Sequence, residues 1–302
     1  MNSFYDILAY GLISGSSYAI VALGYSLIYS VLGVINFAHG DLLTVGAYLC
    51  WFLGSGGVGL PLPLAIVIAL SLTSLFAFCL GRFCIIPAAK RSGIAALVIS
   101  IGISIIIQNA ISLSFTSDAL PFYPSLSETT AGVFPFKPVH VVMLVFSLLA
   151  LAIVWFYFLK RTKIGMEVRA CVSNPKAAYI FGLRKSTVFG VVFLLSGFFA
   201  AIAGIMKGFD DQIIVPTMGF SLGLRAFIAS VIGGITDYRG AIAGAFILGF
   251  VENLSTFALL TVPVLSHLAP LVSKDAIALV LLLLVLLWKP KGLFSASYEQ
   301  RP

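Results

Sequence analysis

The sequence predicts an all-α polytopic membrane protein, a bundle of about 8–10 transmembrane helices with a broken or re-entrant segment near residues 33–53. Of the 302 residues, 60% are hydrophobic and only 10% are charged, whereas about 25% are charged in a typical soluble domain. Long apolar runs recur along the chain, close to the roughly 20 residues that cross a bilayer as a helix. Helices are expected because lipid satisfies no backbone hydrogen-bonding group.

Nine apolar segments account for the predicted bundle, and turn-forming, polar or basic stretches separate them. We expect them to form a single transmembrane domain over residues 1–302, with one extended cytoplasmic loop at about 160–186. In chain order the segments are 7–32, 34–53, 61–81, 94–115, 139–159, 187–207, 222–235, 241–260 and 274–288.

Basic residues assign the two sides of the membrane. Of the 18 Lys and Arg residues, 13 fall in three segments, Arg82–Arg91, Lys160–Lys185 and Lys289–Arg301. Cytoplasmic loops carry an excess of Lys and Arg, so these three segments and the C-terminus are expected on the cytoplasmic side. The N-terminus and the loops Gly54–Pro63, Ser117–Phe136 and Phe209–Phe220 are then expected outside.

The net charge of +7 does not indicate a nucleic-acid partner, because the basic residues are concentrated in the three segments expected on the cytoplasmic side. The four cysteines have no Cys/His spacing typical of a zinc site, so no metal site is expected. The sequence contains no G-x-x-x-x-G-K-[ST] phosphate-binding loop. This chain therefore is not expected to bind ATP or any other cofactor by itself.

The stretch "GVINFAHGDLLTVGAY" (Gly33–Tyr48) places polar residues inside an apolar region. A helix that begins at Asp41 and ends before Gly54 would be only about 20 Å long. If the helix began at Gly33 instead, Asp41 would lie about 12 Å along its axis. Both arrangements put His39 and Asp41 at membrane depth, where ionisable groups usually face a cavity or a partner. Gly40 allows a bend, and Asn36 is a candidate cap for a helix that restarts within the membrane.

Two interpretations of this stretch remain open. Broken helices line water-filled pathways in transporters, which makes these residues candidates for a translocation pathway. Alternatively, Asn36, His39 and Asp41 only satisfy one another and hold two helices together. The two interpretations are compatible.

A second polar stretch, "RTKIGMEVRACVSNPKAAYIFGLRKS" (Arg161–Ser186), lies in the expected cytoplasmic loop. Asn174 and Pro175 can start a short helix, and Gly182 is near its end. The apolar stripe of this helix suits docking into a groove on a cytoplasmic partner. A basic loop facing anionic lipid would explain the charges, but not the stripe, which consists of Ala177, Ala178, Phe181 and Leu183.

Small residues recur at every fourth position in two segments, which lets helix backbones approach closely in lipid. Gly204, Gly240 and Gly244 are the candidate packing residues. The two rows are Ser196, Ala200, Gly204 and Gly208, and Ala241, Ala245 and Gly249 beside Gly240 and Gly244.

These motifs resemble the permeases of high-affinity branched-chain amino acid importers of the ATP-binding-cassette type. "VINFAHGDLLTVGAY" is similar to the most distinctive motif of that family, and Arg161–Gly204 to its coupling region. "VIGGITDYRGAIAGAFILG" (Val231–Gly249) and "WKPKGLF" (Trp288–Phe294) resemble its glycine-rich and C-terminal motifs. Asp237 and Arg239 depart from the family's usual small and proline residues.

The resemblance implies a transport subunit, not an enzyme, that moves leucine, isoleucine and valine inward across a bacterial cytoplasmic (inner) membrane. It also implies a second homologous permease, two cytoplasmic ATPase subunits that hold ATP and Mg²⁺, and an extracytoplasmic substrate-binding protein. By motif position, the implied pathway residues are Asn36, Phe37, His39, Gly40 and Asp41. The implied ATPase-coupling residues are Arg169, Asn174, Pro175, Ala177, Ala178 and Gly182.

Parts of the sequence pattern are shared with proteins of other functions. A urea or short-chain amide permease is the main alternative, because such proteins share these motifs, and a permease for another amino acid is also open. An ion-coupled carrier would need several facing carboxylates within the membrane, and only Asp41 and Glu252 qualify. An intramembrane hydrolase is disfavoured because no G-x-S-x-G motif is present.

Overall fold

The computed structural model describes residues 4–123, 161–173, 185–261 and 273–294, together with isolated positions between 141 and 183. Five helical segments in this part are long and apolar enough to cross a membrane. The only sheet in these ranges is one antiparallel pair of two-residue strands. The predicted all-α membrane fold is therefore confirmed, while the span expected at 139–159 lies mostly outside the described residues.

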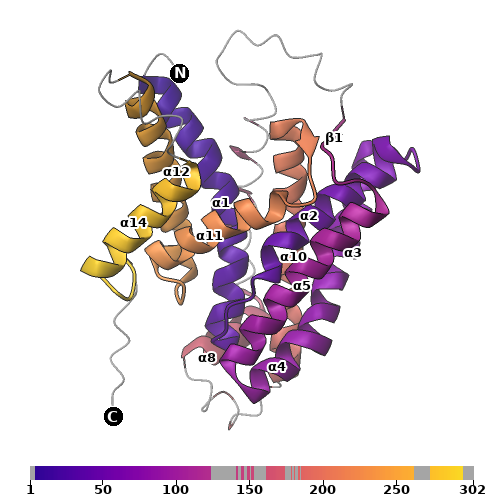
Figure 1. Cartoon of the computed structure of the whole chain (residues 1–302). Coiled ribbons are helices and arrows are strands. Elements are labelled where there is room, and N and C mark those ends of the chain that lie inside the picture. Colours follow the sequence, from indigo (N-terminus) through magenta and orange to yellow (C-terminus); the bar gives the residue numbers. More distant parts are fainter. Residues whose placement is uncertain are drawn as a thin grey trace.

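The helices and strands are shown in Figure 1. Single π-helical turns at Phe52–Gly56 and Gly81–Ile85 extend two of the helices. The first half contains α1 (Phe4–Leu32), α2 (Ala38–Trp51), α3 (Leu62–Leu80), α4 (Ile86–Arg91), α5 (Gly93–Ser114) and β1 (Leu120–Pro121). The second half contains α8 (Lys163–Ser173), α10 (Lys185–Asp211), β2 (Ile213–Ile214), α11 (Met218–Gly233), α12 (Tyr238–Thr261) and α14 (Lys274–Trp288).

Local sequence explains several helix ends. The Ser92 and Ser273 hydroxyls accept hydrogen bonds from the backbone N–H groups three residues later and so cap α5 and α14. Gly33, with φ of 68°, follows the last residue of α1, and Gly234, with φ of 113°, follows α11. Because few side chains tolerate these dihedral angles, glycine is favoured at both ends.

The predicted broken segment is confirmed between α1 and α2. His39 Nε2 lies 3.2 Å from the carbonyl oxygen of Val21, and Val21 precedes Leu32, the last residue of α1, by 11 residues. Eleven residues span about 16 Å of helix. Residues 33–37 therefore run back along α1, and α2 begins well inside the bundle.

The second half of the chain repeats this arrangement in the opposite direction. In Figure 1, α1 begins at the end of the molecule where α10 finishes. Gly219, in the first turn of α11, lies against the backbone of Gly40, so α11 also begins inside the bundle. Two helices that start within the membrane, one in each half, are typical of transporters built from inverted repeats.

The packing follows the same pattern in both halves. Helix α1 packs along α12, and α10 packs along α3. Gly11 and Gly15 of α1 face Phe250 and Phe246 of α12, so this pair is antiparallel, and Gly197 of α10 faces α3. The short helix α2 packs on α10 and α5, and α11 packs on α1 and α14. The core therefore surrounds α1 and α10.

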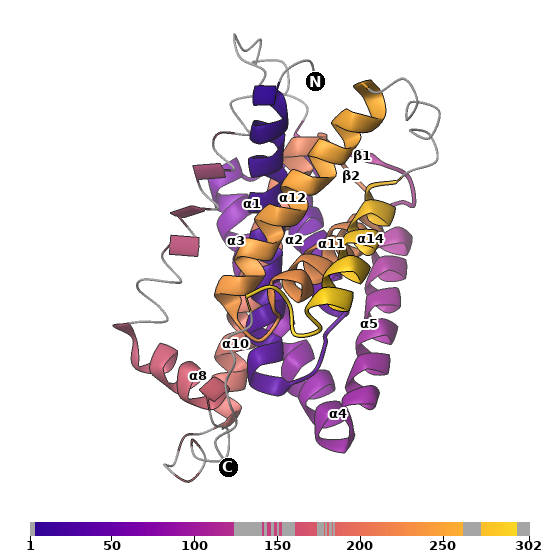
Figure 2. The ribbon, with the colours of Figure 1, turned by 90° about the vertical axis from the view of Figure 1, so that its left-hand side faces the viewer.

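Two of the three basic segments lie, as far as they are described, at one end of the molecule. Helix α4, with Lys90 and Arg91, and helix α8 are both opposite the beginning of α1 in the two views (Figures 1 and 2). This agrees with the prediction that residues 82–91 and 160–185 share one side of the membrane.

Candidate translocation site

His39 connects the start of α2 to both long central helices. Its side chain is fully buried, with Nε2 3.2 Å from the carbonyl oxygen of Val21 on α1 and Nδ1 3.2 Å from Ser196 Oγ on α10. A carbonyl oxygen can only accept, so Nε2 carries the hydrogen, and Nδ1 of the neutral ring accepts from Ser196. The Tyr25 and His39 rings pack in a T-shaped arrangement, with centroids 4.6 Å apart.

Asp41 connects α2 to α5. Its side chain is fully buried and accepts hydrogen bonds from Ser104 Oγ and from Gln108 Nε2, the latter at 3.0 Å. The carboxylate also lies in the first turn of α2, where the helix dipole favours negative charge.

The short helices α2 and α11 cross at three glycines. A Cβ atom on Gly40 would lie 2.6 Å from the carbonyl oxygen of Gly219 and 3.1 Å from Cα of Gly223. The N–H of Gly219 donates to Thr44 Oγ1 at 2.9 Å, so a side chain of α2 satisfies a free backbone donor of α11. The starts of the two helices are thus held together by backbone contact and one hydrogen bond.

The prediction that Asn36 caps α2 is wrong. Phe37 occupies the capping position and makes no side-chain cap bond, because the chain still runs back along α1 at Asn36. The Phe37 N–H donates to Ser100 Oγ at 3.1 Å, and the Phe37 ring packs against Phe227. Asn36 is buried, and its Oδ1 has no hydrogen-bond partner among the described residues.

The alternative that the polar residues of this stretch satisfy one another is also wrong. His39 bonds to α1 and α10, while Asp41 bonds to α5. The side chains diverge from the start of α2 and join it to three different helices. Their arrangement braces the broken helix and does not form a His–Asp pair.

The predicted coupling residues are only partly described. Arg169 is exposed on α8, whereas Ala178 is only 5% exposed and belongs to the chain's own core. Ile180, two residues later, is 80% exposed and was not singled out from the sequence. The remaining four predicted coupling residues, Asn174, Pro175, Ala177 and Gly182, lie outside the described residues.

The predicted packing glycines lie at close backbone contacts. Gly204 of α10 lies against the carbonyl group of Leu43 on α2. Gly240 and Gly244 of α12 lie against the backbone of α11 at Gly233 and Ala229. Any side chain at these three positions would meet backbone atoms that cannot rotate away.

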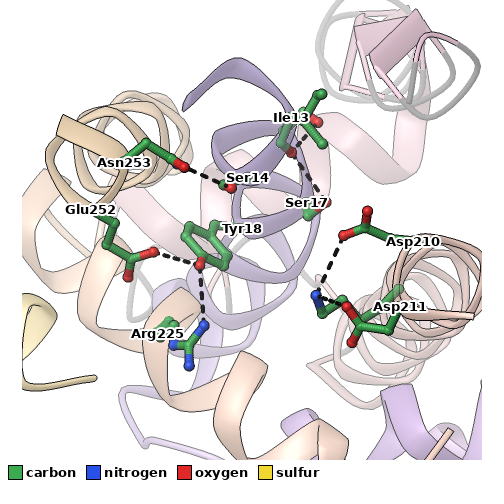
Figure 3. Close-up of polar contacts among 11 residues, drawn as sticks. Ile13, Ser14, Ser17, Tyr18, Asp210, Asp211, Arg225, Glu252 and Asn253 are labelled. Atoms are coloured by element: carbon green, nitrogen blue, oxygen red, sulfur yellow. Dashed lines mark hydrogen bonds and ion pairs between the residues drawn. The ribbon is translucent and has the colours of Figure 1, made fainter. Parts of the chain in front are cut away.

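Sequence reasoning missed a cluster of charged residues between α1, α11, α12 and α14. Tyr18 donates a hydrogen bond to Glu252 at 2.7 Å and lies 3.5 Å from Arg225 Nη1, as Figure 3 shows. Arg225 Nε donates to Asp275 at 2.6 Å. The available signal was the presence of Arg225, Glu252 and Asp275 in three apolar segments, since charged residues usually pair within membranes.

Comparisons with known proteins agree with this architecture. The family model described as the permease component of the branched-chain amino acid transport system matches residues 7–286. The permease protein LivH of Salmonella typhimurium, described as part of a high-affinity branched-chain amino acid transport system, is 31% identical over 94% of this chain and 92% of its own length.

Two further relatives carry the same description. LivH of Escherichia coli K12 is 32% identical over 94% of this chain and 92% of its own length. BraD of Pseudomonas aeruginosa is 30% identical over 95% of this chain and 94% of its own length. The chain therefore belongs to the family of permease components of the branched-chain amino acid transport system, and it is a multi-pass membrane protein.

Proposed function

We propose that this chain is the membrane-spanning subunit of an ATP-driven importer that carries leucine, isoleucine and valine across a bacterial cytoplasmic membrane. The observation that carries the proposal is the match of the family model to residues 7–286. The relatives reported above, at 30–32% identity, are named as permeases for these amino acids. Two helices that start inside the bundle also suit a transport pathway.

The importer has further subunits in this proposal. A second homologous permease pairs with this chain, two cytoplasmic ATPase subunits supply the energy, and an extracytoplasmic protein delivers the amino acid. The chain itself is a transport subunit and not an enzyme. The end that carries α4 and α8 faces the cytoplasm, because both contain basic residues and cytoplasmic loops are enriched in Lys and Arg. We place the C-terminus on the same side.

The start of α2 forms the central part of the pathway in this proposal. Asn36, Phe37, His39, Gly40 and Asp41 shape it. His39 and Asp41 act as braces, because each is fully buried and bonded to neighbouring helices. ATP supplies the energy, so no proton relay between the two residues is needed.

The segment around α8 transmits the ATPase motion. Arg169, Asn174, Pro175, Ala177, Ala178 and Gly182 belong to it. Ala178 packs on the chain's own core, and the exposed Ile180 is the proposed contact with the ATPase subunit.

Uptake of labelled leucine into proteoliposomes tests the proposed function. The complete importer, with ATP and the binding protein, should accumulate leucine against a gradient, while the chain alone should not. Labelled urea serves as the competing substrate. Concentrative leucine uptake by the isolated chain would contradict the need for ATPase subunits, and uptake of urea without leucine would replace the proposed substrate.

The docking surface can be tested with Ile180→Asp. Burying an unpaired carboxylate in an interface costs several kcal/mol, so co-purification with the ATPase subunits should fall by at least about tenfold. Val58→Asp is the matched control, because Val58 is 54% exposed in the loop between α2 and α3 and should leave co-purification unchanged. Undiminished ATPase binding by Ile180→Asp would show that Ile180 lies outside the interface.

A further inference from the structure

The charged cluster around Arg225 lies beside the midpoint of α1. Its central residue, Tyr18, is 14 residues from each end of α1, which runs over 29 residues from Phe4 to Leu32. Tyr18 is therefore about 21 Å from both helix ends, whereas the hydrocarbon core of a bilayer is about 30 Å thick in total. Arg225 and Asp275, bonded to each other beside Tyr18, are thus within the hydrocarbon depth.

Part of this cluster is open at the surface of the single chain. The side chains of Arg225 and Asp275 are 19% and 41% exposed. Partly exposed charges at this depth are too costly to face lipid and instead face a water-filled cavity or protein. The surface between α11 and α14 therefore faces either the transport pathway or the second permease subunit.

The cluster is hydrogen-bonded on its buried side. Tyr18 donates to the fully buried Glu252 and accepts from Arg225, so the three groups form a chain of hydrogen bonds (Figure 3). Nε of Arg225 donates to Asp275, and Nη2 donates to Ser221 at 3.1 Å. The guanidinium group has five N–H donors, and these described bonds use three of them.

We propose that Arg225 is a specificity-determining contact on the pathway wall, and that its guanidinium group binds the carboxylate of the amino acid in transit. This inference rests on the proposed function, because it takes the substrate to be a zwitterionic amino acid. The planar donor pair of arginine matches a carboxylate in a bidentate geometry. Asp275 is the exposed partner of Arg225 between transport events, and it is displaced when the substrate carboxylate binds.

A purely structural clasp between α11 and α14 is the competing explanation, and the two make opposite predictions. In a clasp, Asp275→Asn and Arg225→Gln break the same ion pair, so both lower uptake substantially. A clasp also works with its charges exchanged. A substrate contact requires arginine at position 225, tolerates the loss of Asp275, and does not survive the exchange.

The experiment compares leucine uptake by the complete importer in proteoliposomes, with saturating binding protein and rates normalised to assembled complex. Arg225→Gln should lower the rate at least about tenfold, because it removes a charge-assisted contact. Asp275→Asn should stay within about threefold of the wild type. The double variant Arg225→Asp with Asp275→Arg should remain as impaired as Arg225→Gln. Lys207→Gln, which breaks the ion pairs of Lys207 with Asp210 and Asp211, is the matched control and should transport normally.

Each result decides between the explanations. Recovery of uptake in the charge-exchanged variant, or equal losses in Arg225→Gln and Asp275→Asn, would overturn the proposal in favour of a clasp. If Arg225→Gln does not assemble, Arg225→Lys takes its place, and a wild-type rate in that variant would overturn the role of the guanidinium group. Failure of the wild-type importer to carry leucine would contradict the proposed function instead, and so the two failures are distinguishable.

Discussion

Gly40→Val should prevent the chain from folding stably in the membrane. The first added carbon would lie 2.6 Å from the carbonyl oxygen of Gly219 and 3.1 Å from Cα of Gly223. Because both neighbours are backbone atoms, α2 and α11 would have to separate, and overpacking of this kind costs about 1–3 kcal/mol or more. The measurements are the yield of folded protein from membranes and the thermal unfolding temperature in detergent.

Gly102→Val is the matched control for this substitution. Gly102 lies within α5 and has no atom within 4 Å of the position that its Cβ would take. Both substitutions replace a helical glycine by valine, so the difference in helix propensity is the same. A Gly40→Val protein that is as abundant and as heat-stable as Gly102→Val would contradict the close crossing of α2 and α11.

Asp41→Leu should abolish most transport, whereas Asp41→Asn should retain much of it. Leucine would leave Ser104 and Gln108 without their buried acceptor, at about 1–3 kcal/mol for each unsatisfied group. Asparagine preserves the size and can exchange hydrogen bonds with both neighbours, because the Ser104 hydroxyl and the Gln108 amide can reorient. The measurement is the leucine uptake rate of both variants, normalised to the amount of protein in the membrane.

The pH dependence of uptake provides the decisive control for Asp41. A brace needs hydrogen bonds and not a titrating charge, so the wild type and Asp41→Asn should respond to pH in the same way. Complete loss of uptake in Asp41→Asn, together with a steep pH dependence found only in the wild type, would show that the carboxylate charge itself takes part in transport.

Much of the candidate site could be predicted from residues 33–48. The polar residues His39 and Asp41 interrupt an apolar region, which indicated a broken helix at membrane depth. The capping role assigned to Asn36 failed because a local pattern does not reveal that the chain folds back along α1 before α2 begins. Similarly, the apolar stripe that includes Ala178 indicated a buried face, but not that this residue packs on the chain's own core.

The sequence by itself determined that this protein crosses the membrane repeatedly as helices, and it predicted that the basic loops share one side. These properties follow from the composition and length of each segment taken separately. Only the tertiary structure decided which polar groups meet: His39 bonds to Ser196, 157 positions away, Asp41 to Gln108, 67 positions away, and Arg225 to Asp275, 50 positions away. In lipid a buried polar group without a partner is costly, but which group it meets depends on how distant helices cross, and no local pattern encodes that crossing.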